Sequence, residues 1–410
     1  MARPRSPHRD PAAEAAALLR RLGFAILMIA LPMVALVARR GVVILAPIGI
    51  ALLAIAAVVD GEHRRLSTSL SSLLGRVAGV AVLVALGWAM LSLAWAPFTG
   101  PATERLGNLA ATLALGLVGY LALPERMRSA NLYPLAIGVG AAALLAVGLL
   151  LFEARPTWDE ATITLDRGVV ALALLIWPAA AWMHSRGRDM QSVALVLAVA
   201  IATGLAPSAL SFAGFAAGAL AYLVAASRMR LATTLVAAIG AGLILLAPAL
   251  AFLLAPLDGL APASLVGRYE TWRAMILADP LRLLTGWGFE TALRGRGGLV
   301  PVDAPRTPLF EIWLDLGLVG AAAIAAAFWS AAHGVARIHA AVAPGALAAL
   351  AAGFGVVVVG ASYTEMWFVT SAVVAALLFA AVERGQFRTQ RPKAILPALL
   401  RRGSRQAERG

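Results

Sequence analysis

Two shortages narrow the function of this 410-residue chain before any motif is considered. The sequence contains no cysteine, which excludes disulfides and thiolate metal sites. Charged residues make up only 13% of the chain, against about 25% in soluble globular proteins, whereas hydrophobic residues make up 61%. The chain also lacks a Walker loop, a histidine–carboxylate metal cluster and a nucleophile elbow, so we expect neither a metal nor a cofactor.

Long apolar runs take the place of the missing polar residues. Runs of about 17–25 residues, the length that crosses a hydrocarbon core about 30 Å thick, recur along the chain. They predict an all-α, polytopic membrane protein with about twelve transmembrane helices. The predicted spans are 22–38, 42–59, 77–95, 106–123, 133–152, 168–183, 191–206, 209–226, 231–254, 309–330, 345–361 and 366–382.

The flanking segments set the domain organisation. One transmembrane domain is predicted to fill residues 22–382, after a basic N-terminus at 1–21. The first apolar run is interpreted as a true span and not as a cleaved signal peptide, because the next run begins at once. The basic tail at 383–410 is expected to be disordered or to lie on anionic lipid headgroups.

The distribution of positive charge predicts the topology. A formal charge of +13 would suggest nucleic acid as the partner of a soluble protein, but here the expected partner is the lipid bilayer. With both termini in the cytoplasm, most basic residues fall on the cytoplasmic side, as the positive-inside rule requires. The long polar loop at 255–308, between spans nine and ten, then lies on the outer side, whereas all histidines lie inside.

This outer loop is the main candidate for a functional site. Residues 263–278 are predicted to form a helix in the membrane interface, because their apolar side chains share one face. Pro280 would end that helix, and Gly286 and Gly288 would allow a tight turn after it. The simpler interpretation is an interfacial anchor, with Trp272 in the aromatic belt and arginines reaching the headgroups.

Arginines of the loop suggest a ligand. Guanidinium forks match the oxygens of a diphosphate, and each charge-assisted hydrogen bond is worth about 1.5–3 kcal/mol. We expect Arg268, Arg273 and Arg306 to bind such a group. Arg167, beyond span five, and Glu365, between the last two spans, would join them if the outer segments converge into one polar bowl. Alternatively, Arg167 belongs to a plain helix start and Glu365 is an ordinary loop acid.

The chain resembles the O-antigen ligase and O-antigen polymerase superfamily in its topology and in short motifs. Arg268, Trp272 and Pro280, followed by Gly286 and Gly288, are similar to the arginine helix and Gly-x-Gly turn of that family. The segment 307–320 is similar to its second motif, which ends in Gly-x-x-Gly, and 166–168 followed by Trp177-Pro178 is similar to its mid-chain segment.

The resemblance implies a metal-independent glycosyltransferase of the bacterial inner membrane, working on the periplasmic side. The implied donor is a glycan on undecaprenyl diphosphate. The implied acceptor is a sugar hydroxyl, on lipid A-core for a ligase or on another lipid-linked glycan for a polymerase. Arginines would neutralise the diphosphate as it leaves. Glu290, Trp272 and Glu365 are further possible site residues.

One position departs from the family pattern. Arg306 stands where the family has a histidine, and an arginine cannot act as a general base. Either Asp303 or Glu290 takes the acceptor proton, or no strong base is needed and Arg306 is one more diphosphate ligand. We favour the interpretation in which no strong base is needed, and Asp303 is the first-choice base if one exists.

Two other classes of function stay open. A transporter or flippase for a lipid-linked substrate would place charges on broken helices at mid-membrane, whereas the predicted spans are nearly free of ionisable residues. A non-catalytic protein that keeps the superfamily fold would not need its arginines to converge. Ligase and polymerase activity are not separated by the sequence.

Overall fold

The computed structural model describes residues 11–61, 76–127, 129–152, 160–254, 263–362 and 364–386. Every regular element in these ranges is helical, and an isolated bridge between Arg296 and Val300 is their only β pairing. The elements are α1 (Pro11–Ala25), η1 (Ile26–Ala30), α2 (Leu31–Val34), α3 (Gly41–Val59), α5 (Val77–Ser92), α6 (Thr99–Ala122), η3 (Ser129–Leu132), α7 (Tyr133–Phe152), α8 (Glu160–Ser185), α9 (Asp189–Leu205), α10 (Ala209–Leu254), α11 (Ala263–Ala278), α12 (Arg282–Thr285), α13 (Thr291–Arg294), α14 (Pro308–Val335), α15 (Ala343–Val359) and α16 (Met366–Arg384).

The chain is an all-helical protein suited to a membrane. Among the described residues, eight helical segments are long and apolar enough to cross a bilayer, and α5, α9 and α15 are apolar but shorter. Each predicted span falls on helix, so the prediction of helices at these positions is confirmed. The loop helix predicted at 263–278 is α11.

The longest element, α10, contains two predicted spans and reverses direction between them. Arg228 has non-helical backbone angles (φ −142°, ψ 74°). Leu210 lies near Gly360, just after the end of α15, whereas Ala225 and Ala232 both pack in a cluster with Ala332, near the end of α14. Farther along, the carbonyl of Ile244 accepts a 2.7 Å hydrogen bond from Trp313, in the first turns of α14. The two arms of α10 are therefore antiparallel.

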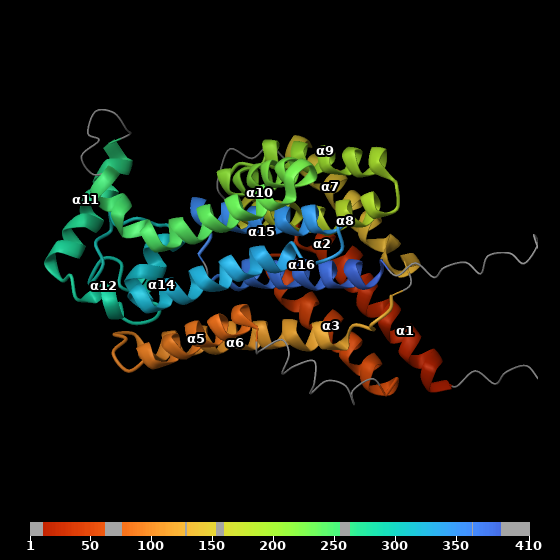
Figure 1. Ribbon diagram of the computed structural model, residues 1–410, viewed down its shortest axis with the longest axis horizontal. Helices are drawn as coiled ribbons and strands as arrows, with labels where there is room; N and C mark the ends of the chain where they lie inside the picture. Colours follow the sequence, from red (N-terminus) through yellow and green to blue (C-terminus); the bar gives the residue numbers. More distant parts are fainter. Residues whose placement is uncertain are drawn as a thin grey trace, which may run out of the picture.

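Figure 1 shows how the bundle presents the loop. Most helices run along the long axis of the molecule, with α14 and α16 between α5 and α6 on one side and α9 and α10 on the other. The short helices α11 and α12 gather at one end. The described start of α1 and the described end of α16 lie at the opposite end, so the loop is separated from both by the length of the bundle.

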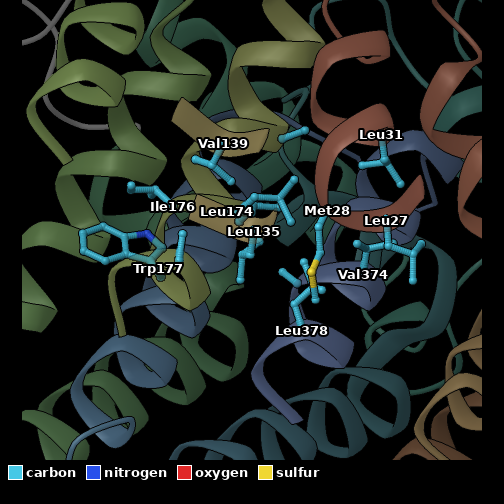
Figure 2. Close-up of a cluster of buried hydrophobic side chains, with 14 of the residues drawn as sticks. Leu27, Met28, Leu31, Leu135, Val139, Leu174, Ile176, Trp177, Val374 and Leu378 are labelled. Atoms are coloured by element: carbon cyan, nitrogen blue, oxygen red, sulfur yellow. The ribbon is translucent and has the colours of Figure 1, made fainter. Parts of the chain in front are cut away.

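The main hydrophobic core is built around α8. Leu174 and Ile176 are buried in one cluster with residues of η1, α2, α7 and α16 (Figure 2), whereas the ring of Trp177 stacks on Phe215 of α10 at 5.8 Å. Helices approach closely where a glycine removes a side chain: a Cβ on Gly138 of α7 would lie 1.9 Å from the carbonyl oxygen of Met28. Small residues at such crossings are the usual packing device of membrane helices.

Parts of several predictions lie outside the described residues, namely 1–10 of the N-terminus, 255–262 of the loop and 387–410 of the tail. The predicted spans carry few ionisable residues, as the sequence shows. Glu311 and Asp315 of α14 are among them, and they are 3% and 2% exposed. Such buried acids need hydrogen-bond partners, and both have them.

Candidate functional site

The Gly-x-Gly turn packs directly against a break in α14. Gly317 interrupts α14 with φ 60° and ψ −158°, a conformation that glycine adopts without strain. A Cβ on Gly317 would lie 2.6 Å from the backbone nitrogen of Gly286, and a Cβ on Gly286 would lie 2.3 Å from the carbonyl oxygen of Asp315. The two motif segments, 286–288 and 307–320, are therefore in contact, and glycine at both positions permits it.

Hydrogen bonds fix this contact. Backbone N–H groups of Trp287 and Gly288 donate to the carbonyls of Leu314 (2.7 Å) and Asp315 (3.1 Å), which the break in α14 frees. The Asp315 carboxylate accepts from the backbone N–H groups of Glu290 (3.2 Å) and Ala292 (2.7 Å). Asp315 was missed in the sequence, where an acid just before Gly317 in an apolar run was its only signal.

Helix α5 supports the same turn from the other side. The indole N–H of Trp88 donates to the carbonyl of Leu316 (2.8 Å), and the hydroxyl oxygen of Ser92 accepts from the N–H of Phe289 (3.1 Å). A Cβ on Gly288 would lie 2.5 Å from the Cα of Ala96. The loop between α12 and α14 is thus attached to two helices.

Glu290 stands at the centre of the attached loop. Among the described residues it is the one non-glycine with a positive φ (70°), and it is 2% exposed. Its Oε1 lies 3.8 Å from Nε of Arg105 and 3.7 Å from Nε of Arg294. Burial raises the pKa of Glu290, and the two arginines act against that shift. A strained, buried acid holding two arginines shapes the loop.

The charges of three arginines interact in this loop. Arg296 donates to the carbonyls of Ala304 (3.3 Å) and Pro305 (2.9 Å), which fixes its guanidinium. Burial lowers the pKa of Arg296, the charge of Arg306 lowers it further, Glu311 opposes the shift and Arg268 adds to it. Arg268, Arg296 and Arg306 are therefore close enough for their charges to interact. Arg296 was not among the predicted site residues.

The first turn of α14 adds a buried acid. Thr307 caps the helix by accepting from the N–H of Phe310 (3.5 Å), and Pro308 follows at the first helical position, as is common there. This start places Glu311 where its Oε2 accepts a 2.7 Å hydrogen bond from the hydroxyl of Ser362. Glu311 was also missed, because in the sequence it is one polar letter in an apolar run.

Arg167 of α8 and Glu365, the N-cap of α16, meet in an ion pair. Nη2 of Arg167 lies 3.9 Å from Oε2 of Glu365, and the guanidinium lies over the ring of Trp367 at 5.4 Å from its centroid. The indole N–H of Trp367 also donates to Glu365 Oε2. The charges of Glu365 and Arg296 both act on Glu311, so the pair of Arg167 and Glu365 is connected to the arginine cluster through Glu311.

Three further predicted site residues differ in exposure and in their contacts. Trp272 is 3% exposed and packs edge-on against Phe310 at 5.3 Å, so it belongs to the core and not to the membrane interface. Arg273 is exposed and lies 5.7 Å from the ring of Phe252, on α10. Asp303 is exposed on a turn. In the described part of the chain, no group of three or more acids and histidines could hold a metal.

An apolar cavity of about 830 Å³ begins next to the site. Phe289, Leu309 and Ile312 line it at the loop end, and Arg76 and Glu383 line it at the far end. Its walls come from α5, α6, α14, α15 and α16. A cavity of this size accommodates a sizeable ligand, and its lining suits a hydrocarbon chain.

No family model matches the chain, and no curated protein matches it. The helices and the site define a polytopic helical membrane protein in which three arginines and several carboxylates gather at one end of the bundle.

Proposed function

We propose that the protein is a periplasmic-face glycan transferase that moves a glycan from undecaprenyl diphosphate onto a sugar hydroxyl, in the manner of an O-antigen ligase or polymerase. The observation that carries the proposal is that Arg268, Arg296 and Arg306 lie close enough for their charges to interact, in a loop whose flanking residues Phe289 and Leu309 line an apolar cavity. A lipid diphosphate has the matching chemistry, with a multiply charged head and a long apolar tail.

The arginines supply the chemistry. Cleavage of the bond between the sugar and the diphosphate places additional negative charge on the leaving oxygen, and fixed guanidinium groups stabilise that charge most in the transition state. Two backbone carbonyls hold the guanidinium of Arg296, so it does not need to reorient as negative charge develops. Arg306 and Arg268, which are exposed, contact the diphosphate.

The apolar cavity takes the lipid tail. Its loop end lies beside Glu311 and Glu290, because Leu309, Ile312 and Phe289 are their neighbours in the chain. A tail entering there would run between α14, α16 and the pair α5 and α6, toward Arg76 and Glu383. The acceptor, lipid A-core or another lipid-linked glycan, would approach from the side of Glu365.

The proposed topology has twelve spans in the bacterial inner membrane, both termini in the cytoplasm and the loop in the periplasm. The break of α10 at Arg228 and the three shorter apolar helices support this count. The described start of α1 and the described end of α16 lie at the same end of the bundle, opposite α11 (Figure 1). This supports placing both termini on one side of the membrane.

A transporter or flippase of a lipid-linked glycan is the second candidate, because α14 is broken at Gly317 next to a buried Asp315. In this chain, however, the Asp315 carboxylate is occupied by two backbone N–H groups. A buried acid already satisfied in this way is better explained as part of the loop attachment than as a transport site.

The experiment is the surface glycan profile of a strain lacking this gene, complemented with the wild type, Arg306→Ala, Arg268→Ala or Arg39→Ala. Arg39 is the control, because it is paired with Glu160 outside the cluster. Loss of the long-chain ladder with full-length lipid-linked glycan accumulating indicates a ligase, and accumulation of single repeats indicates a polymerase. Normal glycan with both cluster variants would contradict the proposal.

A further inference from the structure

Two carboxyl groups of unlike environment lie beside the arginine cluster. Glu311 is 3% exposed and bound to the hydroxyl of Ser362, whereas the side chain of Glu365 is 32% exposed. The charge of Glu365 acts on Glu311, so the two groups belong to one site. Two acids placed in such different environments commonly take different roles in a reaction.

Glu365 is held in place and still accessible. It is the N-cap residue of α16, where the helix dipole favours negative charge. Arg167 on α8 and the indole N–H of Trp367 on α16 both engage Oε2. Among the described residues, no hydrogen-bond donor is seen at Oε1, which leaves this oxygen for a substrate hydroxyl.

We propose that Glu365 is the catalytic base of the glycan transfer, a role that rests on the proposed function. In this step the acceptor hydroxyl loses its proton to Oε1 of Glu365 as its oxygen forms the new bond to the anomeric carbon. The bond from that carbon to the diphosphate oxygen breaks, and its electron pair leaves with the diphosphate beside Arg306. The proton then passes from Glu365 to water.

The other acids are less suited to the step. Asp303 is exposed on a turn. Glu290 is 2% exposed and lies against Arg105 and Arg294, so a sugar hydroxyl cannot reach it. Glu311 is buried and accepts from Ser362. Glu365 alone of these combines a fixed carboxylate with access from the outer face and with a place near the arginines.

Two charged groups lie near Glu365 on other helices. Arg167 faces it from α8, and Glu311 faces it from α14. Trp367, the neighbour from α16, does not titrate. A general base acts only when it is deprotonated, so the rate of transfer should fall on the acidic limb of a pH–rate profile, and removing the base should remove this limb.

The test uses the full chain, purified and reconstituted in liposomes with an undecaprenyl-diphosphate glycan donor and a sugar acceptor. Glu365→Gln is expected to lower kcat by about 10²–10⁴-fold, the usual contribution of a general base, and to lose the acidic limb. The Kd for the donor should stay unchanged, whereas Arg306→Ala should weaken it. Glu365→Asp should retain part of the rate with the limb present.

Two outcomes separate this inference from the proposed function. If the wild type transfers glycan and Glu365→Gln matches its rate and pH profile, the base is elsewhere and this inference alone fails. If the wild type transfers no glycan, both fail. Elution as a single species in detergent shows whether each variant is folded, and Glu365→Asp retains the test if the Gln variant is not.

Discussion

The N–H of Ala292 donates a 2.7 Å hydrogen bond to the carboxylate of Asp315, across 23 residues of chain. The same carboxylate accepts from the N–H of Glu290, so one buried acid of α14 orients the part of the loop that leads to the arginine cluster. The loop is therefore positioned by its attachment to a helix and not by its own short helical turns.

Replacing Asp315 should release the loop. Asp315→Ala leaves two buried N–H groups without an acceptor, at a cost of about 1–3 kcal/mol for each such group. We expect a clearly lower melting temperature of the detergent-solubilised protein, together with loss of donor binding. Asp279→Asn, at a half-exposed acid of the same loop, is the control and should change stability by less than about 0.5 kcal/mol. Equal melting temperatures for Asp315→Ala and the wild type would contradict the attachment.

Gly317 offers a second test of the same contact. Gly317→Ala places a side chain at φ 60°, 2.6 Å from the backbone of Gly286, so either the break or the turn must move. We expect a loss of more than about 1 kcal/mol in unfolding free energy. Gly334→Ala is the matched control in the same helix, because a Cβ there meets nothing within 4 Å. It should be neutral or stabilising, by up to about 1 kcal/mol.

The burial of Glu290 predicts how the stability of the protein changes with pH. Burial raises the pKa of its carboxyl above the ordinary 4.5, so the folded protein binds the proton more tightly than the unfolded chain. The favourable contribution of the protonated form is complete below the unfolded pKa and is lost as pH rises through the folded pKa. Glu290→Gln removes this loss.

The measurement is the unfolding free energy of both proteins across a pH series that starts below 4.5. The variant's stability relative to wild type should rise with pH through the window and then level off. A difference that falls with rising pH would mean that Arg105 and Arg294 outweigh burial, and the assigned direction would be wrong.

The cavity predicts which helix face contacts the lipid tail. Ala327 of α14 lines the cavity, whereas its neighbour Ala326 is exposed and does not. Ala327→Phe should occupy part of the cavity and compete with the tail, which weakens binding of a long-chain lipid diphosphate about tenfold, or about 1.4 kcal/mol. Ala326→Phe should leave it unchanged, and a short-chain diphosphate should bind both variants alike. Equal affinities of both variants for the long-chain lipid would place the tail elsewhere.

Local features of the chain could be predicted from sequence, and contacts between distant residues could not. The apolar runs placed the helices, Gly286 and Gly288 stood out as turn residues, and Gly317 began the Gly-x-x-Gly of the second motif. Their contact with one another depends on how α14 crosses the loop, which no local pattern records. Trp272 looked like an interfacial residue because its partner Phe310 lies 38 positions away.

The role of the buried acids could not be predicted from the sequence for a related reason. Glu311 and Asp315 sit in an apolar run, and only their partners Ser362 and Ala292 explain why a carboxylate is tolerated there. Arg296 looked like any other loop arginine until the carbonyls of Ala304 and Pro305 fixed it. A sequence predicts which charges exist, but the tertiary structure decides which of them face each other.

The most direct test of the account is glycan transfer by the purified protein in liposomes, measured with an undecaprenyl-diphosphate glycan in the absence of metal ions. The account predicts transfer to a sugar acceptor by the wild type and by Arg39→Ala. It predicts loss of at least about 10²-fold in rate for Arg306→Ala and Arg268→Ala, as expected when a fixed group that stabilises the leaving charge is removed. No transfer by a folded wild type, or equal rates for all four proteins, would contradict it.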